Sequence, residues 1–372
     1  MELPPDRSGV PHSARIAGYS EVSTALALIG DRQLTRLVQD APLISSGIGG
    51  RAVLVHVRNT PVFVKRVPLT DLERRPENVM STANIFGLPT FYHYGVSSAG
   101  SGAWRELAAH VMATNWVIEK RCESFPLMYH WRVLAEPPPR PPTPEEQANL
   151  ARQVAYWHGS PAVRRRLEAI ARSSASLVLF CEYIPQGLYE WLNAQATSGD
   201  AAVESACAMV EQALRTDVSF MNSNGLLHFD AHFRNILTDG QRLYFADFGL
   251  AMSSRFELSA IELDFCEKNL SHDGCYTMTQ LVNWLVTTLT DAADPSDRNR
   301  LIRRYAEGDE PVEVPPQAAA VIRRYAPVAA VMNDFYWKLH TESRTTPYPV
   351  DEIRRVCTAT GFDLGLHRPQ RA

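Results

Sequence analysis

Residues 42–69 read PLISSGIGGRAVLVHVRNTPVFVKRVPL. Valine and isoleucine dominate three short runs, which are separated by the glycine-rich SSGIGG (45–50) and by RNTP (58–61). β-Branched residues favour extended backbone, whereas Gly, Asn and Pro favour the turns between strands. The stretch therefore predicts three consecutive strands joined by two tight connections.

Beyond this stretch the pattern changes from strands to helices. We expect a short strand at 88–96, two longer strands at 125–134 and 176–184, and an amphipathic helix at 104–118. The Pro-rich EPPPRPPTP (136–144) predicts a stiff, exposed connector. Strands that precede helices along the chain indicate an α+β fold with a small antiparallel-sheet lobe and a larger, mainly helical lobe.

The order of the elements also suggests where the regions begin and end. Residues 1–40 are expected to contain a leader (1–18) and a helix. We expect residues 41–184 to form the sheet-rich, nucleotide-binding lobe and residues 185–372 to form the helical lobe. The hinge between the lobes is expected just after the strand at 176–184.

Composition excludes several classes of protein. The chain of 372 residues is 45% hydrophobic and 21% charged, with a formal net charge of −4, so it lacks the basic excess of a typical nucleic-acid binder. Its six cysteines form no C-x-x-C pair, which favours a reducing, cytoplasmic location over a disulfide framework or a zinc knuckle. No run reaches the ~18 apolar residues of a membrane span. We therefore expect neither a nucleic-acid partner nor a membrane partner.

A second stretch, LLHFDAHFRNILTDGQRLYFADFGLA (226–251), carries the chemistry. Asp230 and Asn235 lie five residues apart, and two short strands joined by TDGQR follow. If these strands pair, Asp247 is brought close to Asn235 and Asp230. Three oxygen-bearing side chains would then converge, and oxygen ligands suit a hard cation such as Mg²⁺. We expect Gly249 to permit a backbone conformation that a larger residue would resist.

This stretch resembles the catalytic loop and metal-binding motif of the protein-kinase-like superfamily. HFDAHFRN followed by ADFG matches the family's spacing, and H-x-D-x-H-x-x-N is similar to the aminoglycoside phosphotransferase branch of small-molecule kinases. Phe229 stands where protein kinases carry the HRD arginine, and no APE element follows. The resemblance spans about residues 42–252 and implies the bilobal protein-kinase-like fold.

The resemblance also implies roles for individual residues in an ATP-dependent phosphotransferase. Asp230 would be the catalytic base for an acceptor hydroxyl, and Asn235 and Asp247 would hold Mg²⁺. The nucleotide would be bound by several groups: the glycine loop (Gly47, Gly49 and Gly50), Lys65 with its partner Glu106, and backbone groups near Glu182 and Ile184. Glu73 is a competing partner for Lys65. The acceptor would be a small hydroxylated molecule, such as an antibiotic or other metabolite.

Other interpretations stay open from the sequence alone. His232 could contact substrate or phosphate, or it could be structural. His228, Asp230 and His232 could form a metal cluster, because alternate residues of a strand share a face. For the whole chain, the alternatives are a Ser/Thr protein kinase and a nucleotide-binding pseudokinase or scaffold.

Overall fold

The computed structural model describes residues 10–362, apart from 48, 49, 96, 97, 291 and 293. The chain forms two compact units, one containing Met1–Ile184 with Asp247–Glu262 and the other Pro185–Ala246 with Leu263–Ala372. An antiparallel sheet in the N-terminal part followed by mainly helical structure confirms the α+β order expected from the sequence.

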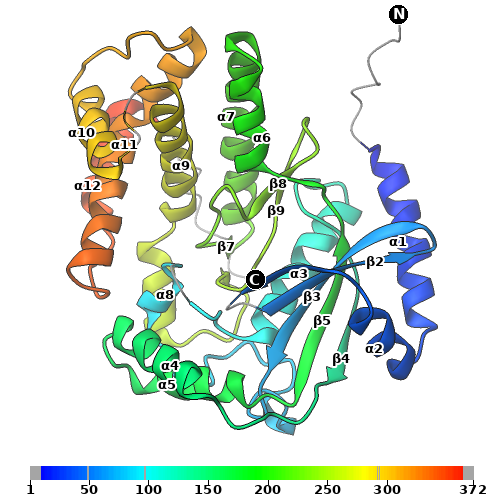
Figure 1. Cartoon of the computed structure of the whole chain (residues 1–372). Helices are drawn as coiled ribbons and strands as arrows, with labels where there is room; N and C mark the ends of the chain where they lie inside the picture. Colours follow the sequence, from blue (N-terminus) through cyan, green and yellow to red (C-terminus); the bar gives the residue numbers. More distant parts are fainter. Residues whose placement is uncertain (1–9, 48–49, 96–97, 291, 293, 363–372) are drawn as a thin grey trace, which may run out of the picture. The chain divides into compact units, whose positions relative to one another are not determined.

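The first unit is built on a five-stranded antiparallel sheet with the order β1-β2-β3-β5-β4 (Figure 1). The three strands predicted over 42–69 are present, and the two longer strands follow as expected. β5 is buried along almost its whole length: it lies between β3 and β4, and α3 (Ala103–Ile118) covers the face that carries Leu177 and Leu179. The strands are β1 Leu43–Gly47, β2 Gly50–Val57, β3 Thr60–Leu69, β4 Met128–Ala135 and β5 Ala175–Glu182.

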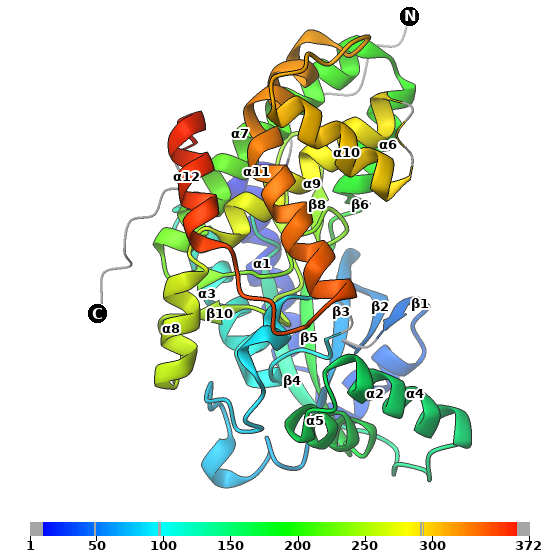
Figure 2. The same ribbon diagram turned by 90° about the vertical axis from the view of Figure 1, so that its left-hand side faces the viewer.

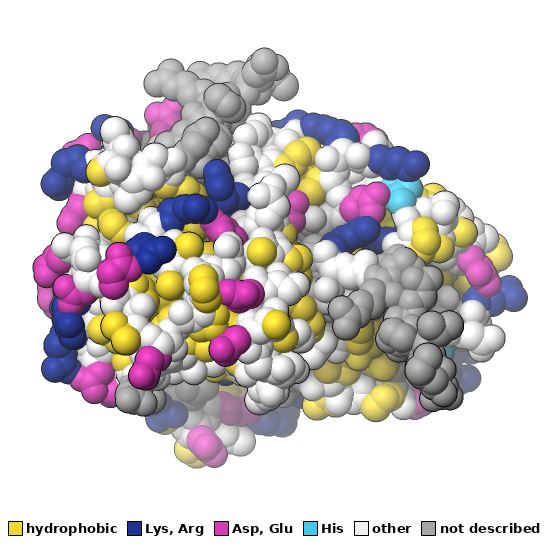
Figure 3. All heavy atoms as spheres, turned by 90° about the horizontal axis from the view of Figure 1, so that it is seen from above, with side chains coloured by type: hydrophobic (Ala, Val, Ile, Leu, Met, Phe, Trp, Pro, Cys, Tyr) yellow, Lys and Arg dark blue, Asp and Glu magenta, His cyan; other side chains and the backbone are white. Residues whose placement is uncertain are grey.

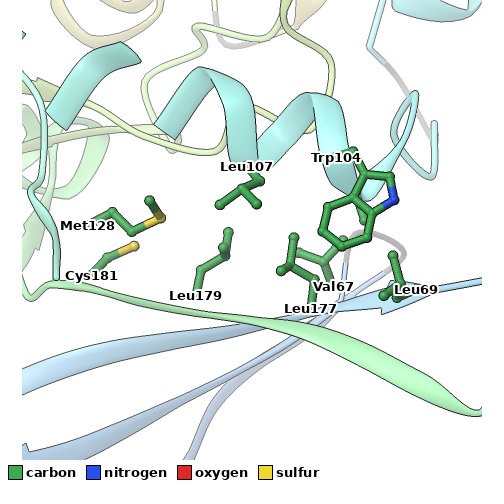
Figure 4. Packing of buried hydrophobic residues seen from close by; sticks show 9 residues of the cluster. Val67, Leu69, Trp104, Leu107, Met128, Leu177, Leu179 and Cys181 are labelled. Atoms are coloured by element: carbon green, nitrogen blue, oxygen red, sulfur yellow. The ribbon is translucent and has the colours of Figure 1, made fainter. Parts of the chain in front are cut away.

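Helix α3 (Ala103–Ile118) packs on one face of this sheet and forms its main core (Figure 4). Trp104 and Leu107 point from the helix toward Leu177 and Leu179 of β5. Alternate residues of a strand share a face, so these two leucines present a continuous apolar surface to the helix. Burial of this core fixes the position of α3 along the sheet, and with it the position of Glu106.

Two sequence predictions for the first unit are wrong. Residues 12–18 are not a leader, because helix α1 already begins at His12 and extends to Ala27; residues 1–9 lie outside the described part. The expected strand at 88–96 is instead a 3-10 turn, Thr90–His93. The side chains of Phe91 and Tyr92 pack around Trp157, and the ring centroids of Tyr92 and Trp157 lie 4.6 Å apart. The backbone of this turn does not pair with a strand.

The remaining elements of the first unit lie around the sheet. Helix α2 follows α1 after a break at Gly30, and α4 begins with a Thr143–Glu146 capping box directly after the Pro-rich connector. Helices α4 and α5 lie side by side (Figures 1 and 2). The bounds are α2 Asp31–Gln39, η1 Pro76–Asn78, α4 Pro144–Tyr156, α5 Pro161–Ala171 and β10 Met252–Ser253.

Residues Asp247–Glu262 belong to the first unit, whereas the sequence placed them in the helical lobe. They belong there because they are bonded to the start of α3 and the loop before it. Ser101 donates its backbone N–H to the Gly249 carbonyl at 3.0 Å, and Arg105 forms a buried ion pair with Glu262 at 2.7 Å. Local sequence pattern does not predict such long-range contacts.

The second unit is mainly helical. Helix α11 packs against α7, α9, α10 and α12 (Figure 2), and β6, β8 and β9 form a small sheet that includes part of the 226–246 stretch. Helix α8 begins in the first unit and continues into the second, since the boundary lies between Glu262 and Leu263. The bounds are β6 Gln186–Gly187, α6 Leu188–Thr197, α7 Asp200–Ser223, β7 Leu226–Leu227, β8 Ile236–Thr238, β9 Leu243–Phe245, α8 Ala260–Lys268, α9 His272–Leu289, α10 Pro295–Ala306, α11 Pro316–Thr341 and α12 Val350–Thr360.

Within the described residues, no helix combines the length and the apolar character that crossing a membrane would require.

Charged side chains of both signs are interspersed on the face drawn in Figure 3, where dark-blue Lys and Arg lie among magenta Asp and Glu. The charges on this face therefore do not gather by sign.

Candidate active site

Lys65 lies in the middle of β3, opposite Ala52 of β2 and Leu179 of β5. Its Nζ donates to Glu106 Oε1 at 2.6 Å and to Asp247 Oδ1 at 2.8 Å. All three residues belong to the first unit, although 182 residues separate Lys65 from Asp247 along the chain. A strand, a helix and the segment after β9 thus bring one ammonium group between two carboxylates.

The two carboxylates determine the charge state of Lys65. Burial by itself would lower the pKa of Lys65, but the nearby Asp247 and Glu106 carboxylates outweigh burial and raise that pKa well above its ordinary value. The side chain of Lys65 is 12% exposed and that of Glu106 only 4%, whereas that of Asp247 is 44% exposed. Lys65 is therefore a fixed positive charge beside a carboxylate that solvent and ligands can reach.

The structure also separates Glu106 from its competitor. Glu73 does not contact Lys65, because its carboxylate accepts hydrogen bonds from the Ala103 N–H at 2.8 Å and from the Thr70 N–H at 2.9 Å. It also forms a buried ion pair with Arg166 at 2.9 Å. Glu73 thus holds the N-terminus of α3, where unpaired backbone N–H groups need acceptors.

The backbone at Asp247 differs from what the sequence suggested. The positive φ lies at Asp247 itself, at 62°, and Gly249 is not among the residues with positive φ. Gly249 instead allows close packing, since a Cβ there would lie 3.3 Å from Asp247 Oδ1 and 3.5 Å from Glu106 Oε2. A non-glycine residue in the left-handed region is uncommon and often marks a functional position.

The predicted glycine loop is described only in part. Gly47 and Gly50 face each other where β1 turns into β2, and Gly49 lies outside the described residues. A Cβ at Gly50, whose φ is +133°, would lie 2.2 Å from the Arg66 carbonyl oxygen. The fit of β2 against β3 therefore already requires glycine at position 50, whether or not a phosphate lies nearby.

The second unit brings together Asp230, His232 and Asn235. Asn235 Nδ2 donates to both the backbone oxygen and Oδ2 of Asp230, each at 3.0 Å. His232 Nδ1 accepts the Arg234 N–H at 3.2 Å, which places the proton of a neutral ring on Nε2. That Nε2 lies 3.8 Å from Asp230 Oδ1. The three side chains form one partly exposed polar cluster on the loop before β8.

Asp273 holds the backbone of this loop, a role that the sequence did not predict. Its carboxylate accepts the backbone N–H groups of His228 at 2.6 Å and Phe229 at 2.9 Å, and it is fully buried. Phe229, directly before Asp230, has a positive φ of 61°, which is rare for a bulky residue. Asp273 lies in the first turn of α9, where an acidic residue is ordinary, so no pattern in the sequence singles it out.

His228 ties the loop to the end of β9. Its Nε2 lies 3.0 Å from the Ala246 carbonyl oxygen, and its Nδ1 accepts the Asp230 N–H at 3.3 Å. Ala246 also donates its own N–H to the Asn235 carbonyl at 3.0 Å. The residue that precedes Asp247 in the chain is thus fixed by both ends of the 228–235 loop.

Glu182 and Ile184, expected near a nucleotide base, lie at the end of β5 and at the end of the first unit's main segment. The Glu182 N–H donates to the Leu127 carbonyl at 2.7 Å, so a base would have to use other backbone groups here. Its side chain is paired with Arg15 of α1, a residue that the sequence did not indicate.

Among the residues that the structure describes, no three His, Cys, Asp or Glu side chains form a group that could hold a metal ion. The His228–Asp230–His232 cluster considered from the sequence is therefore not supported, because His228 is turned toward Ala246.

Comparison with protein-family models finds no match, and comparison with curated proteins finds no similar sequence. The function must be argued from the site itself.

Proposed function

We propose that this chain is an ATP-dependent phosphotransferase that transfers the γ-phosphate to a hydroxyl group of a small molecule. The observation that carries the proposal is the Lys65 ammonium held between Glu106 and Asp247. A strand lysine that is mostly shielded from solvent and is fixed as a cation beside an accessible carboxylate suits the binding of nucleotide phosphates. A merely structural lysine would not require two buried or half-buried carboxylates from distant parts of the chain.

The side chains available for Mg²⁺ fit that cation. Asn235 uses its Nδ2 for Asp230, so Oδ1 is the atom with which it would ligate a metal, under the amide orientation that these hydrogen bonds assign. Asp247 would add carboxylate oxygen. Mg²⁺ in such enzymes is commonly held by one or two protein groups together with substrate phosphates, and when bound it neutralises the charge of those phosphates.

Asp230 is the proposed base. Its side chain is 25% exposed, so an acceptor hydroxyl could approach it, while the bond from Asn235 Nδ2 orients the carboxylate. In the proposed reaction Asp230 accepts the hydroxyl proton as the acceptor oxygen bonds to the γ-phosphorus and the bond to the ADP oxygen breaks. His232, with its proton on Nε2, would donate a hydrogen bond to a substrate or phosphate oxygen beside Asp230.

The small size of the proposed acceptor rests on the sequence. His232 stands two residues after Asp230, which resembles small-molecule kinases, and Phe229 replaces the arginine that activation-loop control in protein kinases uses. The segment after Asp247 is bonded to the start of α3 through the buried Arg105–Glu262 pair. These features favour a phosphotransferase for small hydroxylated compounds over a phosphorylation-controlled protein kinase.

The test is a screen of the full-length chain with Mg²⁺ and ATP against hydroxylated metabolites and natural products. Mass spectrometry should detect a product heavier than the acceptor by one phosphoryl group, together with ADP. A peptide array with Ser, Thr and Tyr acceptors serves as the second arm. Transfer only to peptides would show a protein kinase, and nucleotide binding without transfer to any acceptor would show a pseudokinase.

Two variants control this screen. Asp247→Ala should abolish metal-dependent turnover, and Asp230→Asn should remove most of the rate while the Kd for ATP stays near that of the wild type. Asp264→Asn, an exposed carboxylate of α8, should change neither quantity. Unchanged product formation in the Asp247→Ala protein would refute the assignment.

A further inference from the structure

Helix α1 carries a buried arginine that reaches the segment where the nucleotide base is expected. Arg15 is only 3% exposed. Arginine is almost never buried to this extent unless its charge is paired, so the partners of Arg15 matter. It shares one side of α1 with Val22 and Leu26, both fully buried, and the helix packs against β4 and β2. The burial of Arg15 is therefore part of how α1 docks on the sheet.

The guanidinium group of Arg15 makes contacts with two separate segments. Its Nε donates to Glu182 Oε1 at 2.9 Å, and its Nη2 donates to Glu182 Oε2 at 2.7 Å. The same group donates to the backbone oxygens of Glu123 at 2.9 Å and Phe125 at 2.6 Å. Only a planar fork of several N–H donors can satisfy a carboxylate and two carbonyls together, so lysine is not an equivalent residue here.

Glu182 is held from a further direction. Its Oε2 accepts the Leu127 N–H at 3.0 Å, while its own N–H donates to the Leu127 carbonyl at 2.7 Å. The side chain is only 12% exposed. The end of β5 is thus fixed through both its backbone and its side chain, two residues before the main segment of the first unit ends at Ile184.

We propose that Arg15 is a positioning residue for nucleotide binding, which sets the backbone of residues 182–184 for contact with the base through the Glu182 carboxylate. This inference rests on the proposed function. Without Arg15 a buried carboxylate would lose its counter-charge, and such a group must become solvated or protonated. Movement of Glu182 toward solvent would displace the backbone that follows it.

The experiment compares two ligands of the full-length chain, ATP and inorganic triphosphate, each with Mg²⁺, by isothermal titration calorimetry. Triphosphate reports on the phosphate-binding groups alone. In Arg15→Met we expect the Kd for ATP to rise by about tenfold, because loss of roughly one net hydrogen bond to the base corresponds to that change, while the Kd for triphosphate stays unchanged. The kcat at saturating ATP should be retained as KM for ATP rises.

Further variants separate positioning from general loss of structure. Arg132→Met removes the exposed Arg132–Asp31 pair between β4 and α2 and should leave both Kd values unchanged. Glu182→Gln keeps an oxygen for the Leu127 N–H but removes the buried charge. The double variant of Arg15→Met with Glu182→Gln should therefore bind ATP more tightly than Arg15→Met alone, as coupled residues in contact do.

The outcomes are distinguishable. Wild-type protein that binds neither ligand and transfers no phosphate overturns the proposed function together with this inference. Wild-type protein that transfers phosphate but binds ATP no more tightly than triphosphate overturns only the inference, because the base then adds no affinity. If the wild type binds and transfers phosphate but Arg15→Met weakens both ligands equally, or neither, only the positioning role of Arg15 is overturned. A double variant no better than Arg15→Met would show that Glu182 does not mediate the effect.

Discussion

The Nζ of Lys65 lies 2.6 Å from Oε1 of Glu106, which joins the central strand β3 to helix α3. The glutamate side chain is 4% exposed, so the pair is largely removed from water and is screened less than a surface ion pair. Asp247 reaches the same ammonium group at 2.8 Å. Replacing Lys65 leaves the buried Glu106 carboxylate without a cation, whereas replacing either carboxylate leaves Lys65 paired with the other one.

Lys65→Ala should lower the rate of phosphoryl transfer by about 10²–10³-fold, as expected when one group that stabilises the charge of the transition state is removed. The substitution also leaves Glu106 buried without its cation, so the folded fraction must be measured by circular dichroism before rates are compared. Lys268→Ala, which removes an exposed lysine of α8, is the matched control. A Lys65→Ala protein that is folded and fully active would exclude a role in phosphate binding.

Glu106 and Glu73 are expected to respond differently to the same change. Glu106→Gln should lower kcat with a modest change in stability, because the amide keeps a hydrogen-bond acceptor for Lys65. Glu73→Gln weakens the buried pair with Arg166. The free energy of unfolding should therefore decrease, by up to the ~3–5 kcal/mol that breaking such a pair costs. Its kcat per folded molecule should stay unchanged. Urea unfolding and steady-state kinetics on both variants decide between them, and a reversed pattern would make Glu73 the functional residue.

The sequence predicted the regular elements well where local pattern determines structure. The runs over 42–69 became β1, β2 and β3, and the run at 176–184 became the buried strand β5, because Val-rich segments fit a covered sheet. It failed at 88–96, where Tyr92 is buried against Trp157 and makes no strand. There a long-range apolar contact outweighed local propensity.

The candidate site was predictable only as far as residue types and spacing carry it. Lys65 and Glu106 could be predicted because their order along the chain resembles that of the lysine and glutamate in kinase-like proteins. The structure was needed to exclude Glu73, whose carboxylate accepts the Ala103 N–H at the start of α3. Arg15 and Asp273 could not be found. Each is a charged residue in an ordinary helical pattern, and its importance depends on a partner 167 or 44 to 45 residues away in the chain.

Asp273→Asn tests the support of the 228–235 loop. The amide would turn an N–H group toward one of the two backbone donors, His228 or Phe229, and thereby lose one hydrogen bond. Loss of a partner by a buried donor costs ~1–3 kcal/mol of unfolding free energy, and displacement of Asp230 should lower kcat by about 10²-fold. The Kd for ATP should change little. Thermal unfolding, calorimetry and single-turnover rates measure the three quantities.

Asp264→Asn is the control for that variant, because the Asp264 carboxylate is exposed and pairs with Lys268 on the same helix, α8. It should match the wild type in all three measurements. If Asp273→Asn lowers ATP affinity as strongly as kcat, the 228–235 loop takes part in nucleotide binding and does not act on the acceptor alone.

His93 should make stability depend on pH in a mildly acidic range. Burial, together with the nearby Arg105 cation, lowers the pKa of His93 from 6.5 to about 4, and its Nδ1 lies 2.9 Å from the Leu250 carbonyl oxygen. Between these two pH values the unfolded chain holds a proton on this ring that the folded chain does not. The stabilisation is therefore fully present above pH 6.5 and is lost as the pH falls toward 4. The full effect is on the order of 3 kcal/mol.

His93→Asn keeps an N–H donor for the Leu250 carbonyl but cannot titrate. Urea unfolding of this variant between pH 7 and pH 4 should show a shallower loss of stability than the wild type. His56→Asn, on the exposed side of β2, should keep the wild-type slope. The comparison of slopes removes the contribution of the carboxylates, which titrate in all three proteins. Identical slopes for His93→Asn and the wild type would mean that His93 binds its proton over the same pH range in the folded and unfolded chains, so that burial does not keep the ring neutral.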